Sequence, residues 1–188
     1  GVDFGTCTEQ APPDPPFAET TGAGRLFGAS GGVMEAAVRT AHLLVAGSEL
    51  EGDPKVAEAR GREGVRRFTV TAGEAELNLA VVNGLGRLTE TLDELLDPQT
   101  SLHFVEVMSC PGGCVGGGGQ PYDTDVQAVK ERLERLYEVD RRSRTRRAHE
   151  NAGVQALYED LLGRPLSEAS HRLLHRTYTD RRPHSVQV

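Results

Sequence analysis

Hydrophobic and polar positions recur at regular intervals along much of the chain, and these intervals predict its secondary structure. Apolar residues follow helical spacing over 33–45, and Gly47 comes next as the expected helix end. Residues 65–71 and 75–82 alternate apolar and polar side chains as strands do, with Gly73 between them. The two segments therefore predict a β-hairpin that follows a helix.

Helix and strand patterns continue on both sides of this hairpin. Leucines mark one face of a helix predicted over 85–96, and apolar, β-prone residues predict a strand over 102–108. A short strand is predicted over 23–28, followed by a turn at Gly28 and a helix N-cap at Ser30. This order predicts an α/β fold in which a mixed β-sheet has flanking helices.

The predicted strand, glycine turn and helix over 23–45 have two interpretations. Such a turn can point backbone N–H groups and a helix dipole at a bound anion, or it can let the strand and helix pack closely. The turn has no lysine of the phosphate-loop type, so a nucleotide site is not predicted.

Beyond Pro121 the pattern becomes helical. Residues 124–139 predict a helix capped by Asp123 or Thr124. The basic run at 141–147 predicts a solvated helix face or, as an alternative, a surface for an acidic partner. Two short helices separated at Gly163 follow, and this tail is expected to be an appendage that forms no core by itself.

Composition excludes several classes of function. The net charge of -7 over 188 residues argues against general nucleic-acid binding. No apolar run approaches the ~20 residues of a membrane-spanning helix, and no signal-peptide pattern is present, so a cytoplasmic protein is expected. Three cysteines argue against a disulfide framework and for reduced thiols. Cys7, in the proline-rich loop over 1–22, is interpreted as a spectator thiol or alternatively as a cluster ligand.

The other two cysteines lie in the most informative stretch of the chain, EVMSCPGGCVGGGGQP at 106–121. Cys110 and Cys114 are spaced C-x-x-x-C, stand among glycines and directly follow the strand predicted over 102–108. Because glycines carry no Cβ atom, the backbone there can approach a ligand closely. The pattern predicts a buried strand that ends by delivering two thiolates into a loop with little side-chain bulk.

Four kinds of site are compatible with two such cysteines to different degrees. A structural zinc site needs a second ligand pair, and a redox disulfide favours C-x-x-C spacing; the chain has neither. A nucleophilic cysteine needs a histidine partner, and His103 on the preceding strand is a poor candidate. An iron–sulfur cluster fits thiolates among glycines, but a cubane takes about four cysteines. Spacing alone therefore predicts half of a cluster site.

The stretch over 106–121 resembles the third cluster-binding signature of the iron-only (FeFe) hydrogenases, E-x-M-x-C-x-x-G-C-x-x-G-G-G-Q-P, at every specified position. Residues 21–37 resemble the glycine-rich segment of the same catalytic domain, and residues 149–175 resemble the family's small-subunit or C-terminal segment. The resemblance implies the C-terminal lobe of the catalytic domain over 1–122 and a helical, small-subunit-like tail over 123–188.

The resemblance also implies roles for individual residues. Cys110 is expected to ligate a [4Fe–4S] cubane, and Cys114 to ligate the cubane and bridge to the diiron subsite of the H-cluster. Met108 would line the diiron pocket, and Phe27 and Gly28 would lie against the carbonyl and cyanide ligands of that subsite. The implied activity is that of an FeFe-hydrogenase of the ferredoxin type, with no catalytic role for the tail.

Two signatures of the family, T-S-C-C-P and M-P-C-x-x-K, are absent from the chain. In the family, these signatures carry two cubane ligands, the proton-relay cysteine and the lysine that contacts a cyanide, so the chain lacks those residues. The chain is therefore expected to act with a segment or second chain that carries them, with ferredoxin or another redox partner, and with H2 and protons as reactants. The main alternative is a hydrogenase-like iron–sulfur protein, for cluster assembly or sensing, without H2 turnover. A zinc or purely structural domain is a further alternative.

Overall fold

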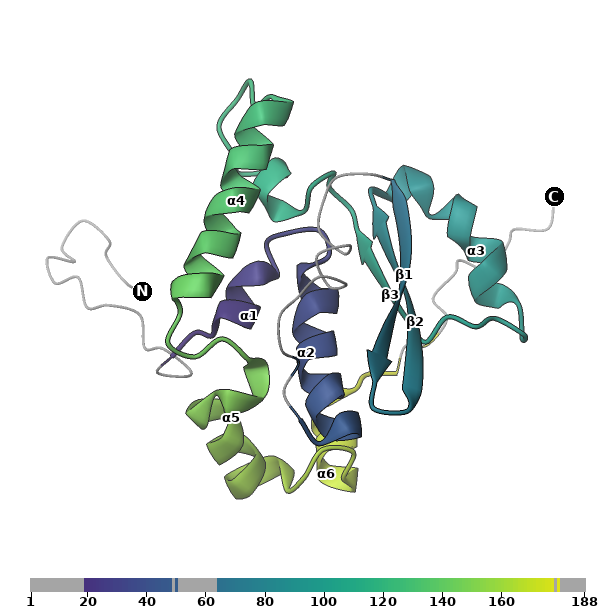
Figure 1. The fold of residues 1–188 in the computed structure, drawn as a ribbon, viewed down its shortest axis with the longest axis vertical. Coiled ribbons are helices and arrows are strands. Elements are labelled where there is room, and N and C mark those ends of the chain that lie inside the picture. The colour runs from purple at the N-terminus through teal and green to yellow at the C-terminus, as the bar shows by residue number, and fades with distance from the viewer. Residues whose placement is uncertain (1–18, 49, 51–63, 178, 180–188) are drawn as a thin grey trace, which may run out of the picture.

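The computed structural model describes residues 19–48, 50, 64–177 and 179. Figure 1 shows a small sheet with helix α2 on one side and helix α3 on the other, while α1, α4 and α5 lie beyond α2. The elements are α1 Gly22–Leu26, α2 Gly32–Ala46, β1 Val65–Ala72, β2 Ala75–Asn83, the 3-10 turn η3 Leu85–Arg87, α3 Thr89–Leu96, β3 Phe104–Met108, the 3-10 turn η4 Cys114–Gly116, α4 Val126–Arg142, the 3-10 turn η5 Ala148–Glu150, α5 Ala152–Leu157, the π-helical turn η6 Tyr158–Leu162 and α6 Glu168–Leu174.

The described sheet has the strand order β1-β2-β3 and is mixed, as predicted. β1 and β2 form the predicted antiparallel hairpin, and its turn at Gly73 uses a positive φ of 63°. β2 and β3 are parallel, with Asn83 opposite Met108 at their carboxyl ends. Because parallel strands end at the same edge of a sheet, the segments that follow both strands lie together.

Helix α2 and the sheet share the first hydrophobic core. The predicted helix over 33–45 is confirmed, and it ends at Gly47 in the left-handed conformation. Its apolar side packs on alternate residues of β1 and β2, as the period of two along a strand requires. The buried set is Met34, Val38, Phe68, Val70, Leu79 and Val81. Each such side chain contributes roughly 1.5–3 kcal/mol when it is removed from water.

The strand predicted over 23–28 is wrong, because Gly22–Leu26 forms helix α1. The Oγ1 atom of Thr21 caps it by accepting from the N–H of Gly24 at 3.0 Å. The N–H of Gly22 donates to the carbonyl of Thr145 at 2.9 Å, so a distant segment also satisfies the helix start. Tertiary contacts therefore decide this conformation. Ser30 is likewise not the cap of α2, since Gly31, with a φ of 91°, holds that position.

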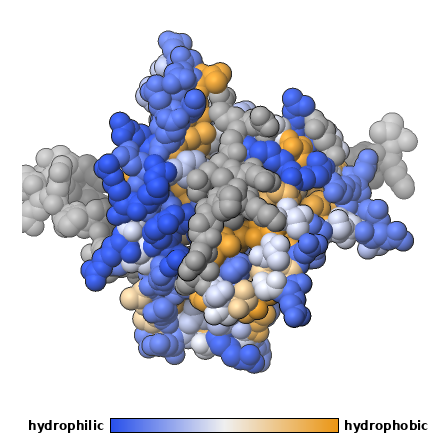
Figure 2. Space-filling model, viewed as in Figure 1, coloured by the Kyte–Doolittle hydropathy of each residue, from blue (hydrophilic) through white to orange (hydrophobic). Residues whose placement is uncertain are grey.

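Helix α4 shares a second hydrophobic core with α1 and with the loop that contains the cysteines. The helix runs over Val126–Arg142, and Asp125 caps it in place of the predicted Asp123 or Thr124. Figure 1 shows α4 beside α1. The buried set is Leu26, Ala29, Val115, Val129, Leu133 and Tyr137. The first helix of the tail is therefore built into the domain, although its outward face is hydrophilic (Figure 2).

A buried ion-pair network fastens α4 to α2. The guanidinium of Arg39 donates to both carboxylate oxygens of Asp140 at 2.9 Å and also to Glu35. Arg146 donates to the same carboxylate at 2.7 Å, so one residue of the predicted solvated basic run pairs with a buried group while its own side chain stays partly exposed. Burial alone would raise the pKa of Asp140, but the two arginines together hold it below its ordinary value.

Asp140→Asn is expected to destabilise the fold strongly. The amide cannot balance the buried charge of Arg39, and breaking a buried pair on one side costs about 3–5 kcal/mol. Because the folded pKa of Asp140 is lowered, this contribution is fully present above the ordinary pKa of Asp. It is lost as the pH falls through the lowered value. Urea unfolding at pH 7 and at pH 3 measures both effects.

The matched control is Glu138→Gln on the same helix. Glu138 pairs with Arg135 and Arg142, whose side chains are exposed, and such surface pairs contribute little to stability. Equal destabilisation by the two variants at pH 7 would contradict the role given to Asp140.

Candidate functional site

Strand β3 leads directly into the loop that carries both cysteines. Cys110 is half-buried and Cys114 is exposed, and both thiols are free. Cys114 begins the short 3-10 turn η4, which is closed by the N–H of Gly117 donating to the carbonyl of Cys114 at 3.1 Å. The predicted glycine loop after a strand is confirmed. The prediction that this strand is buried is wrong, because β3 lies at the edge of the described sheet and its Phe104 and Val107 are 37% and 39% exposed.

Backbone hydrogen bonds fasten this loop to the turn between α1 and α2. The N–H of Ser30 donates to the carbonyl of Gly112 at 3.1 Å, and the N–H of Val115 donates to the carbonyl of Gly28 at 3.2 Å. From the sheet, the Oδ1 atom of Asn83 accepts from the N–H of Gly112 at 2.8 Å. The loop is thus held by three hydrogen bonds at two of its residues, Gly112 and Val115, and Gly28 lies next to the turn that begins at Cys114.

Two glycines are required by close approach. Gly113 has a φ of 90°, and a Cβ atom there would lie 2.7 Å from the carbonyl oxygen of Gly28. A Cβ atom on Gly117 would lie 2.9 Å from the Sγ atom of Cys110. The first glycine lets the loop and the turn touch, and the second leaves room for the Cys110 thiol.

The carboxylate of Glu106 joins β3 to the start of α2. It accepts from the N–H of Gly31 at 2.6 Å and from the N–H of Met34 at 2.7 Å, and Glu106 is only 5% exposed. Burial raises the pKa of Glu106, while these hydrogen bonds and the charge of Arg66 oppose the rise. An anion does lie at this helix N-terminus, where the dipole favours it, but it is the protein's own carboxylate.

The remaining predicted site residues flank the same loop. Phe27 precedes Gly28 and is 50% exposed. Met108, the last residue of β3, is half-buried and two positions before Cys110, and its carbonyl accepts from the N–H of Gly84 at 2.7 Å. Cys7 lies outside the described residues.

The sequence pattern did not identify two residues that hold the site in place. Asn83 anchors the loop, and Glu106 caps α2, although the sequence marks both only as part of a turn and of a motif. A carboxylate inside an otherwise apolar strand was the available signal for Glu106, because a buried charge needs partners.

The donor chemistry fits one side of a sulfur-rich metal group. Two free thiols stand in a loop whose glycines leave the backbone open to a close approach, which suits a cluster ligated by thiolates. Among residues 19–48 and 64–177, no group of three or more His, Cys, Asp and Glu side chains is placed to hold a metal ion. His103 does not serve Cys110, because its Nδ1 atom accepts from the N–H of Asn78 at 2.9 Å. The described residues therefore offer two free thiols, and a metal group at this place would need further ligands from elsewhere.

The fold and the site define an α/β protein with a thiolate-bearing, glycine-lined loop, and the comparisons identify its family. The family formed by the C-terminal domain of the iron-only hydrogenase large subunit matches residues 1–118, and that of the iron hydrogenase small subunit matches residues 126–181. The chain therefore belongs to the iron-only hydrogenase family, with large-subunit and small-subunit sequence in one polypeptide.

Individual relatives agree with this assignment. The chain is 46% identical over 169 residues to an NADP-reducing hydrogenase subunit of Solidesulfovibrio fructosivorans, covering 89% of this chain and 28% of the relative. It is 38% identical over 175 residues to iron hydrogenase 1 of Clostridium pasteurianum, covering 90% and 30%. The chain thus spans less than a third of the length of these relatives.

Solved structures show the same fold. An [FeFe]-hydrogenase variant from Chlamydomonas reinhardtii has 35% identity and a TM-score of 0.61, over 81% of this chain and 45% of that chain. A relative with another printed function also matches over a shorter stretch: the cytosolic iron-sulfur assembly component 3 of Mus musculus is 38% identical over 108 residues, covering 56% of this chain and 22% of the relative. In the described part of the chain, no helix has the length and apolar character to cross a membrane.

Gly113→Ala is expected to destabilise the cysteine loop. A side chain at this positive φ is strained by about 1–3 kcal/mol, and its Cβ atom also meets the backbone of Gly28. Gly118→Ala is the matched control, because nothing lies within 4 Å of its added Cβ atom. Urea unfolding and amide exchange of the loop measure the effect, and identical behaviour of the two variants would refute the close-packing argument.

Glu106→Gln is expected to destabilise the fold by about 1–3 kcal/mol, because the amide NH2 group cannot accept from a helix N–H. The folded pKa of Glu106 is raised, so its contribution is complete below the ordinary Glu pKa and is lost as the pH rises through the folded value. The gap between wild type and variant is therefore largest near pH 4 and narrows toward pH 8. Thermal unfolding across this range measures it, with the exposed ion-pair residue Glu94→Gln as control. A gap that widens with pH contradicts the prediction.

Proposed function

We propose that this chain provides two of the cysteine ligands of an H-cluster and forms part of an FeFe-hydrogenase that catalyses reversible H2 oxidation and proton reduction. The observation that supports this most is the placement of two free thiols, Cys110 and Cys114, on a loop fastened to the glycine turn at Gly28. Membership of the hydrogenase family supplies the class of cofactor.

Each site residue has a defined task in this proposal. Cys110 would hold the [4Fe–4S] cubane, and Cys114 would hold the cubane and the diiron subsite with its carbonyl, cyanide and dithiolate ligands. When bound, this group supplies the electron and hydride chemistry, as cofactors do in redox enzymes. Met108 would line the diiron pocket, and Phe27 and Gly28 would lie against the carbonyl and cyanide ligands of that subsite.

The remaining ligands must come from the part of the hydrogenase catalytic domain that is absent from this sequence. Cys114 is exposed and Phe27 is half exposed, which is the state expected of residues that a second lobe covers. The proposed partners are that segment or chain, ferredoxin or another redox partner, and the small molecules H2 and H+. The proposed compartment is the cytoplasm.

The experiment is co-production of the chain with a polypeptide that carries the T-S-C-C-P and M-P-C-x-x-K signatures, under conditions that mature the H-cluster. H2 evolution from reduced methyl viologen and infrared bands of metal-bound carbonyl and cyanide are expected. Cys114→Ser is expected to abolish both, whereas Cys7→Ser, outside the motif, keeps them. Normal H2 evolution by the Cys114→Ser variant would contradict the proposal.

The second candidate is an iron–sulfur assembly protein without H2 turnover, which the similarity to the mouse assembly component favours. The same preparation separates the two functions. Cubane-type iron without carbonyl and cyanide bands after maturation supports the assembly function.

A further inference from the structure

Helix α4, which belongs to the small-subunit part of the chain, lies directly under the cysteine loop. A Cβ atom on Gly116 would lie 3.4 Å from a methyl group of Val129, and one on Gly28 would lie 3.3 Å from the Cδ1 atom of Leu136. Val129, Arg132 and Leu136 are spaced by three and four residues, so they lie on one face of the helix. That face contacts both segments that form the site.

Arg132 is the polar residue on this face. Its Nη1 atom donates to the carbonyl of Val115 at 3.0 Å, next to Cys114 in the sequence. The guanidinium also donates to the Oγ1 atom of Thr124 at 3.3 and 3.4 Å, and the Thr124 hydroxyl donates to the carbonyl of Pro121 at 2.6 Å. One half-buried side chain therefore connects the start and the end of the loop over 115–124.

The composition of this loop makes such a connection necessary. Four consecutive glycines, Gly116–Gly119, lose more conformational freedom on ordering than any other residues would. A planar guanidinium presents several N–H donors in a fixed geometry, so it holds two separate acceptors with less loss of side-chain freedom than the flexible ammonium of a lysine. Hydrogen bonds from a charged donor are also stronger than those between neutral groups.

We propose that Arg132 is a positioning residue for Cys114: by joining Val115 to Thr124 it holds the glycine-rich loop in the conformation that presents this thiol. The helical tail, expected from the sequence to have no catalytic role, thereby becomes part of the site's support. The meaning for hydrogen chemistry rests on the proposed function, but the positioning itself is a property of the protein alone.

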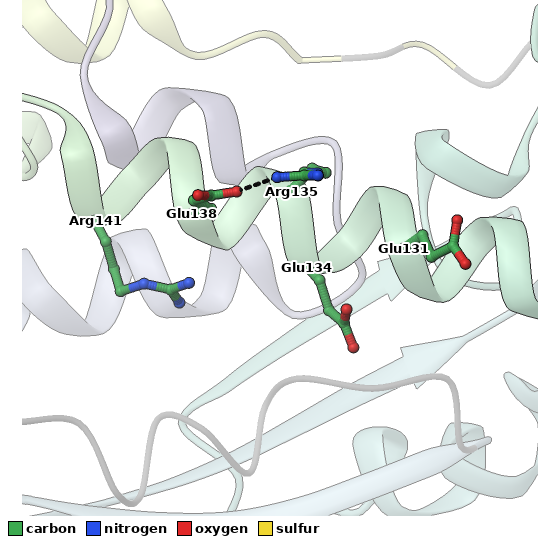
Figure 3. Close-up of a pocket in the computed structure, with 5 residues that line it drawn as sticks. All are labelled: Glu131, Glu134, Arg135, Glu138 and Arg141. Carbon is green, nitrogen blue, oxygen red and sulfur yellow. Dashed lines mark hydrogen bonds and ion pairs between the residues drawn. The ribbon is translucent and has the colours of Figure 1, made fainter.

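Arg135 offers a matched control on the same helix. Its side chain is exposed and bonds to Glu138 at 2.7 Å, in a shallow surface pocket lined only by charged residues (Figure 3). Substitution of Arg135 removes the same charge and the same helix-forming side chain, one turn from Arg132. The hydrogen bond that this substitution removes goes to Glu138 and not to the loop.

The first experiment uses the full chain without metal, in a Cys7→Ser background, so that Cys110 and Cys114 are the thiols that report. In Arg132→Ala and Arg132→Gln, the amide exchange of Gly116 and Gly117, followed by NMR, is expected to accelerate about tenfold, the equivalent of roughly 1.4 kcal/mol. The rate at which iodoacetamide alkylates Cys114, relative to the rate for Cys110, is expected to change several-fold. Arg132→Lys is expected to recover part of the protection, and Arg135→Ala to match the wild type.

Two outcomes overturn the proposal. In the first, Arg132→Ala and Arg132→Gln show the same loop amide exchange and the same thiol reactivity as Arg135→Ala. In the second, amide exchange accelerates equally in the loop and throughout α4. The second would show loss of helix packing instead of loss of a loop contact. If Arg132→Ala does not fold, the glutamine and lysine variants carry the test.

The second experiment uses the assembled complex described above. Arg132→Gln is expected to alter the EPR signal of the reduced cluster at unchanged iron content, while Arg135→Ala leaves it as in the wild type. Arg132 could protect the loop amides in the metal-free chain while the assembled complex takes up no iron. That combination would refute the proposed function and leave the positioning role intact. An unchanged EPR signal in a loaded complex would overturn the link between positioning and the cluster.

Discussion

The carboxylate of Glu106 is the interaction on which the arrangement of the site depends. It is the one side chain of β3 that binds the N-terminus of α2, through the N–H groups of Gly31 and Met34. The strand that ends in the cysteine loop and the helix that follows the glycine turn are therefore fixed relative to each other before any ligand is present. The backbone hydrogen bonds between loop and turn, from Ser30 and Val115, join the segments that directly follow this strand and directly precede this helix.

The same interaction explains a feature that the sequence leaves open. A glycine turn before a helix predicts an anion site, and the alternatives are a bound ligand and close packing. Here the anion is internal, since a carboxylate from a residue 75 positions away occupies the site. A local pattern cannot reveal this, because the donor groups and the acceptor are 72 and 75 residues apart in the sequence. The cost of burying the charge, visible as a raised pKa of Glu106, is offset in part by the two N–H groups and Arg66.

The elements that sequence reasoning predicts well are those with a strong period of their own. Alternation, helical spacing and glycine positions predict the hairpin, α2 and the strand before Cys110. The C-x-x-x-C spacing among glycines predicts half of a cluster site. Segment 23–28 has no such period, and its helical conformation comes from the cap by Thr21 and from the Thr145 carbonyl. The burial of Asp140 against Arg39, which joins α4 to α2, is equally invisible, because the pair is 101 residues apart.

These long-range contacts join the part of the chain that carries the hydrogenase motif to the helical tail that follows it. The tail begins beyond the hydrogenase motif, yet Leu136 lies against Gly28, and Arg132 donates to Val115. A loop with four successive glycines has little order of its own, so its conformation must be imposed by neighbours on one side if the other side is to receive a ligand. The turn at Gly28, Asn83 and α4 provide that side, while Cys114 stays exposed on the other. Metal sites depend on groups that orient their ligands as much as on the ligands themselves. In the proposed hydrogenase, the helix supplied by the small-subunit part would belong to that orienting set.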